Sequence, residues 1–72
     1  MNRPPLILVT ASLEERGMEF ADTSLSLSNR YPAAIANAGG LPWVMPCLLD
    51  KDFVATCVHR CDGVLLTGGD DI

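Results

Sequence analysis

The apolar run from Leu6 to Val9 constrains the fold of this chain more than any other feature. Its residues, Leu-Ile-Leu-Val, are consecutive and do not alternate with polar residues. A strand with one solvated face alternates apolar and polar side chains, whereas a parallel strand covered on both faces is apolar throughout. Pro4 and Pro5 precede the run and set its start. The run therefore predicts a buried strand of a parallel sheet.

Two helices with marked ends are predicted further along the chain. In NRYPAAIANAGG, Ser28 or Asn29 is the expected N-cap, Pro32 falls in the first turn, and Gly39-Gly40 supplies a left-handed stop. In LDKDFVATCVHRCDG, Asp50 is the expected N-cap. Apolar side chains recur at helical spacing in both segments: Tyr31, Ala34, Ile35 and Ala38 in the first, and Phe53, Val54, Cys57, Val58 and Cys61 in the second.

Short apolar strands are predicted after each helix, from Trp43 to Met45 and from Val64 to Leu66. The order is then β-α-β-α-β, which indicates an α/β protein with a parallel sheet and right-handed crossovers. Residues 11–28 show no clear period and are expected to form a long, partly irregular connection. A long connection after a parallel strand is more often functional than structural.

Composition excludes several classes of function. The chain has 72 residues and a net charge of −4 with scattered acidic residues, which argues against a nucleic-acid-binding protein or a basic membrane surface. No apolar stretch approaches the ~20 residues of a membrane span, and no signal peptide is recognisable. Three cysteines cannot all pair internally, so we expect reduced thiols in a cytoplasmic protein with neither cofactor nor metal.

The cysteines and the single histidine are weak candidates for chemistry. Cys57 and Cys61 lie on the apolar stripe of the second helix, which favours packing over a metal or redox site. Cys47 follows Pro46 at a strand end but lacks the Gly-x-Cys-x-Gly setting of a nucleophile elbow. His59 is expected on the outer, solvated face of the helix.

The strongest site signal is Thr67-Gly68-Gly69-Asp70-Asp71, directly after a predicted strand. Adjacent glycines let backbone N–H groups approach a ligand without a Cβ in the way, which suits a phosphate or a developing oxyanion. The motif is neither Gly-x-Gly-x-x-Gly nor a Walker loop. From these residues alone, a tight structural turn explains the motif equally well.

Three segments in order, RPPLILVT, YPAAIANAGGLPWVMP and CDGVLLTGGDDI, resemble the N-terminal part of class I glutamine amidotransferase-like proteins. The resemblance is closest to the γ-glutamyl hydrolase branch, peptidase family C26, which includes γ-glutamyl-γ-aminobutyrate hydrolases. It covers most of the chain outside residues 11–28. It implies a flavodoxin-like three-layer α/β/α sandwich. We expect residues 1–72 to be the N-terminal portion of one such domain, with the remainder of the domain absent.

The resemblance also implies an activity, the hydrolysis of γ-glutamyl amides by a cysteine nucleophile through a thioester. The family's nucleophile lies further along the chain and its His and Glu partners near the C-terminus, so no cysteine here matches it. The family's oxyanion-hole glycine corresponds to the backbone N–H of Gly69, with Gly68 allowing the turn. Asp71 and Ile72 also match the family's Asp-Ile/Val step, whereas Asp70 stands where that branch often has glycine or another residue.

This interpretation carries expectations about partners. The full-length protein would take a small γ-glutamyl substrate, while these residues alone would be inactive. They would pair with the missing C-terminal part or with a second copy, because a three-stranded piece leaves exposed edges. Two alternatives stay open: a flavodoxin-like module that binds an anion such as phosphate, and a non-catalytic interaction fragment.

Overall fold

The computed structural model describes residues 3–15, 22–46 and 50–67, which form a parallel sheet, a short hairpin and two helices. The strands of the sheet lie in the order β4-β1-β5. The elements are β1 (Leu6–Val9), β2 (Ser12–Glu14), β3 (Ser24–Ser26), α1 (Arg30–Asn37), β4 (Leu41–Val44), α2 (Lys51–Arg60) and β5 (Gly63–Leu65).

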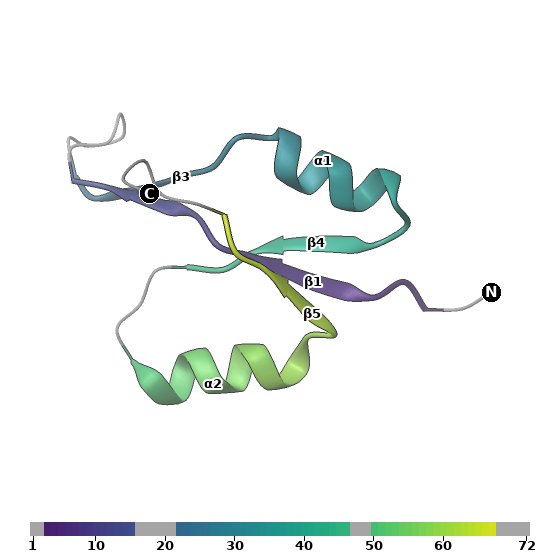
Figure 1. Ribbon diagram of the computed structural model, residues 1–72. Helices are drawn as coiled ribbons and strands as arrows, with labels where there is room; N and C mark the ends of the chain where they lie inside the picture. The colour runs from purple at the N-terminus through teal and green to yellow at the C-terminus, as the bar shows by residue number, and fades with distance from the viewer. Residues whose placement is uncertain (1–2, 16–21, 47–49, 68–72) are drawn as a thin grey trace.

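The two helices cover opposite faces of the sheet, as Figure 1 shows, so the architecture has three α/β/α layers. The chain crosses from β1 to β4 in one direction and from β4 to β5 in the other. Crossovers of the same hand then place their helices on opposite faces. Among the three parallel strands, counted along the chain, β4 is the second, β1 the first and β5 the third. This second-first-third order is that of flavodoxin-like sheets. The predicted α/β fold with a parallel sheet is confirmed.

The first strand is the centre of the core, as its unbroken apolar run predicts. It pairs in parallel with β4 on one side and β5 on the other. Among the described residues only Leu8 and Val9 are buried, with 7% and 0% of their surfaces exposed. A strand with a neighbour on each side and a helix over each face has no solvated side, which explains the lack of alternation.

The outer strands differ from their predicted positions and burial. The strand predicted at residues 43–45 is β4, which begins at Leu41 and ends at Val44. The strand predicted at residues 64–66 is β5, which covers residues 63–65. Trp43 is 59% exposed and Leu66, beyond β5, is 75% exposed. The prediction that the strand at residues 64–66 is buried is therefore wrong. Each outer strand has β1 as its only neighbour among the described residues, so its other edge pairs with no described strand.

The ends of α1 follow local backbone rules closely. The Ser28 hydroxyl oxygen accepts the Arg30 N–H at 3.2 Å, while Asn29 makes no capping bond with its side chain. At the other end, Gly39 has φ +96°. The Gly39 N–H donates to the Ala36 carbonyl at 3.1 Å, and the Gly40 N–H donates to the Ile35 carbonyl at 2.9 Å. These two bonds form a complete Schellman motif, so the predicted glycine stop is confirmed.

The second helix begins at its predicted cap. Oδ1 of Asp50 accepts the N–H groups of Asp52 at 2.9 Å and of Phe53 at 3.2 Å. Asp50 therefore satisfies two of the N–H groups that a helix start leaves unpaired.

Residues 11–28 contain more regular structure than predicted. The segments β2 and β3 pair as an antiparallel hairpin, with Leu13 opposite Leu25. Each strand has only three residues, which is too short for a reliable period, so the hairpin within this partly irregular connection was not predicted. Glu14, Glu15 and Asp22 are exposed.

Neither α1, with 8 residues, nor α2, with 10, has the length and apolar character that a bilayer crossing requires, and the described residues contain no other helix.

Candidate functional site

The candidate site lies at the carboxyl ends of β1 and β5. The chain leaves β1 toward β4 on one side and later reaches β5 on the other side, so the topology reverses between β1 and β5. Ligands of open α/β sheets bind outside the carboxyl ends of the strands at such a switch point. Thr10 follows β1 and Thr67 comes two residues after β5, and the two residues meet at this point.

Thr10 and Thr67 are joined by a compact set of hydrogen bonds, which we call the threonine clamp. The Thr67 N–H donates to Oγ1 of Thr10 at 2.9 Å, and the Thr67 hydroxyl donates to the Thr10 carbonyl at 2.9 Å. The two hydroxyl oxygens are 3.3 Å apart. The Thr10 N–H donates to the Leu65 carbonyl at 3.1 Å, which continues the sheet pairing up to the clamp. Both threonines are half-buried.

The clamp fixes the end of β5 to the end of the central strand. Thr67 is the last described residue, and Gly68 and Gly69 follow it directly in the sequence. These two predicted site residues lie outside the described residues, as do Asp70, Asp71 and Ile72, so their roles stay predictions. The structure nevertheless anchors the residue before them at the edge where α/β proteins bind ligands.

Sequence reasoning missed Thr10. Thr10 directly follows the apolar run of β1, and Thr67 directly follows the apolar residues Val64 to Leu66, at and just beyond the end of β5. These two strands are neighbours in the sheet. That repetition was the available signal, but it gains meaning only when β1 and β5 are known to be adjacent and parallel.

The other candidate residues lie elsewhere. The half-buried thiols Cys57 and Cys61 belong to the α2 region, where Cys61 Sγ donates to the Val58 carbonyl at 3.1 Å. Cys57 lines a hollow of about 280 Å³ between α2 and the sheet, together with Leu6, Leu8, Trp43, Thr56 and Arg60. This position agrees with a packing role.

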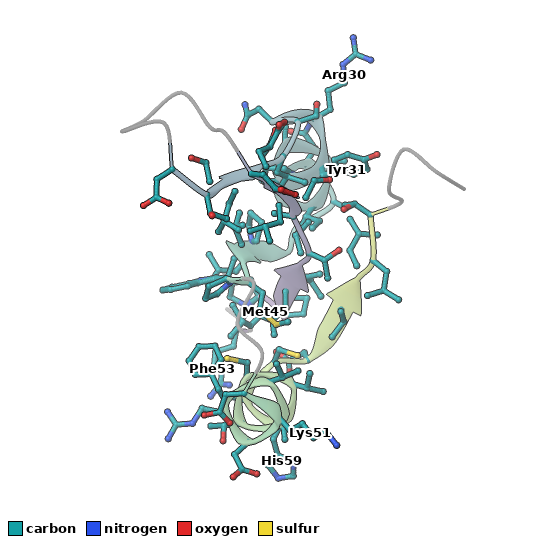
Figure 2. The ribbon with its side chains drawn as sticks, turned by 90° about the vertical axis from the view of Figure 1, so that its left-hand side faces the viewer. Arg30, Tyr31, Met45, Lys51, Phe53 and His59 are labelled. Carbon is teal, nitrogen blue, oxygen red and sulfur yellow. The ribbon has the colours of Figure 1, made fainter. Side chains whose placement is uncertain are left out.

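His59 is exposed and points away from the sheet (Figure 2), as expected for a solvated residue. Cys47 lies outside the described residues. Within residues 3–15, 22–46 and 50–67, no three His, Cys, Asp or Glu side chains are grouped to hold a metal ion.

The comparison with family models decides the family. The model for Peptidase C26 matches residues 5–72, which is nearly the whole chain. The chain belongs to the peptidase C26 family. The predicted resemblance is thus confirmed at the level of the family, and membership supports a hydrolase of the glutamine amidotransferase-like kind. No curated protein and no solved structure matched the chain. The family match does not distinguish the γ-glutamyl branch from the others.

Proposed function

We propose that this chain is part of a cysteine hydrolase that cleaves γ-glutamyl amide bonds, with the Gly69 N–H as an oxyanion donor. Membership of the peptidase C26 family supports the reaction class. The observation that carries the proposal is the threonine clamp, which anchors the residue before Gly68 and Gly69 at the switch point of the sheet. The carboxyl ends of the strands at a switch point are where parallel α/β sheets bind their ligands.

The proposed chemistry has two steps. A cysteine thiolate attacks the γ-carbonyl carbon, the carbonyl oxygen becomes an oxyanion, and the amine leaves with a proton to give a thioester. Water then hydrolyses the thioester to glutamate and frees the thiol. A fixed N–H that faces the oxyanion accelerates such reactions by about 100- to 1,000-fold. Glycine suits this position because it has no Cβ to keep the substrate away.

We do not assign the nucleophile to Cys57 or Cys61. Both lie in the α2 region against a face of the sheet, and neither occupies a strand-to-helix turn. In this proposal the nucleophile and its histidine and glutamate partners come from outside these 72 residues, which alone do not catalyse the reaction. The odd number of cysteines favours a reducing compartment, so we place the protein in the cytoplasm.

A pair of isomeric substrates tests the function. The complete gene product is assayed with γ-glutamyl-p-nitroanilide and with α-glutamyl-p-nitroanilide, and release of p-nitroaniline is followed. We expect the γ isomer to be cleaved at least about 100-fold faster. In the α isomer the α-carboxyl group is the anilide itself, so the groups of a site built to bind a free α-carboxylate beside the α-amino group are left unpaired. Alkylation with iodoacetamide is expected to abolish the reaction. Equal rates for both isomers, or activity that survives alkylation, would contradict the proposal.

A further inference from the structure

We propose that the Thr10 hydroxyl group binds the substrate by donating a hydrogen bond to the α-carboxylate of the γ-glutamyl group. This inference rests on the proposed function, because it names the part of that substrate which Thr10 contacts. Two independent observations support it. The hydrogen bonds of the threonine clamp leave one hydroxyl proton without a close partner, and the strand order places Thr10 where α/β sheets bind ligands.

The clamp accounts for the proton of Thr67 but not for that of Thr10. A threonine hydroxyl has one proton to donate and two lone pairs that accept. The Thr67 hydroxyl donates its proton to the Thr10 carbonyl at 2.9 Å. Oγ1 of Thr10 acts as an acceptor, from the Thr67 N–H at 2.9 Å. Neither of these two bonds uses the proton of the Thr10 hydroxyl.

That proton has one acceptor among the described residues, and the contact is long. Because the Thr67 proton goes to the Thr10 carbonyl, Oγ1 of Thr67 is the acceptor in the contact between the two hydroxyl groups, whose oxygens are 3.3 Å apart. Hydrogen bonds of this kind are normally about 2.5–3.0 Å long. The described residues therefore hold the Thr10 proton weakly, and an oxygen atom of a ligand can compete for it.

The position of Thr10 suits a ligand donor. Thr10 directly follows the central strand at the point where the topology reverses between β1 and β5, which is where ligands of such sheets bind. The donor is also held in place, since the Thr67 N–H fixes Oγ1 of Thr10 and the preceding residue, Val9, is fully buried. A donor that is already fixed loses little freedom when a ligand binds.

The chemistry of the γ-glutamyl group identifies the acceptor. Its α-ammonium group only donates hydrogen bonds, while its α-carboxylate and its scissile carbonyl accept them. Hydrogen bonds to an ionised acceptor are about twice as strong as those between neutral groups. We therefore assign the Thr10 donor to the α-carboxylate, and the experiment separates this acceptor from the scissile carbonyl.

A pair of substrates isolates the α-carboxylate. 4-Aminobutyryl-p-nitroanilide is γ-glutamyl-p-nitroanilide without its α-carboxylate, and the two compounds contain the same scissile carbonyl. Release of p-nitroaniline from each by the complete gene product is measured, and the rate without enzyme is subtracted. The readout is the ratio of kcat/KM for the γ-glutamyl compound to that for the 4-aminobutyryl compound, in which an effect common to both cancels.

Thr10→Val and Thr10→Ala both remove the donor, and they differ in the shape of the side chain. We expect each to lower the ratio about 10- to 100-fold, because the charged acceptor loses its partner. The change should lie mainly in KM for the γ-glutamyl compound, since the carboxylate does not take part in the chemical step. Thr10→Ser keeps the hydroxyl group and should keep the wild-type ratio. Unfolding midpoints verify that the variants are folded.

Thr67→Val is the matched control. It removes the other hydroxyl group of the clamp and its bond to the Thr10 carbonyl, but it keeps the Thr67 N–H and the Thr10 hydroxyl. Any loss of activity in this variant should fall equally on both substrates, so the ratio should stay within about twofold of the wild-type value.

The outcomes separate this inference from the proposed function. An unchanged ratio in folded Thr10→Val and Thr10→Ala overturns the inference even if both rates fall, because Thr10 then serves a group that the two substrates share. An equal fall of the ratio in Thr67→Val also overturns it, since the effect would follow from loss of the clamp. If the wild-type protein cleaves neither compound, the proposed function fails. The dissociation constants of the same compounds, measured by calorimetry, then test Thr10, and equal or absent binding of the two by the wild-type protein overturns the inference.

Discussion

At the scale of single residues, Gly39 gives the clearest prediction of stability. Its φ of +96° is a conformation that side chains with a Cβ rarely adopt, and a Cβ there would meet no atom within 4 Å. Gly39→Ala should therefore lower the free energy of unfolding by about 1–2 kcal/mol through backbone strain alone. Gly39→Asn should cost less, because asparagine tolerates the left-handed conformation. Urea unfolding of the variants measures both; equal costs would contradict this explanation.

Some contacts of single residues could be predicted from the sequence, and others could not. The caps at Asp50 and Gly39 were predictable because capping depends on a few neighbouring residues. The choice between Ser28 and Asn29 was not, since both types cap equally well and only the backbone conformation of Asn29 decides between them. Thr10 was missed because its partner is 57 residues away, and the threonine that follows each of two apolar runs gains meaning only when the two strands are known to be neighbours.

At the scale of elements, Asp62 joins the loop after α2 to the start of the central strand. Oδ2 of Asp62 accepts the Leu6 N–H at 2.8 Å, and the Asp62 N–H donates to the Leu6 carbonyl at 2.8 Å. Asp62→Ala should lower the free energy of unfolding by about 1 kcal/mol, a modest value because the bond is exposed. Glu14→Ala on β2 removes the same charge from an exposed side chain and serves as the control in urea unfolding. Equal effects of the two substitutions would show that Asp62 has no special role.

Some helices and strands could be predicted from the sequence better than others. The strand at residues 6–9 follows from an unbroken apolar run, and both helices follow from apolar side chains at helical spacing with marked ends. The hairpin formed by β2 and β3 does not, because its three-residue strands leave no readable period and it is defined by pairing between segments. The ends of β4 and β5 shifted by one or two residues, since register with β1 fixes them.

At the scale of the whole molecule, the sheet is open at both outer strands among the described residues. Large apolar side chains remain exposed beside them, including Trp43 on β4 and Leu66 beyond β5. Exposed apolar edges of this kind favour association. We therefore keep the proposal that further protein, from the rest of the domain or from a second copy, covers these surfaces. The strand order, with β1 between β4 and β5, is what brings the distant residues Thr10 and Thr67 together.

In the proposed function, the Gly69 N–H stabilises the oxyanion in γ-glutamyl hydrolysis. Gly69→Pro removes that N–H, and kcat for γ-glutamyl-p-nitroanilide is compared with that of the wild-type complete gene product. Circular dichroism and the unfolding midpoint verify that the variant is folded. We expect a fall in kcat of about 100- to 1,000-fold with little change in KM. A folded variant whose kcat stays within about threefold of the wild-type value would contradict it.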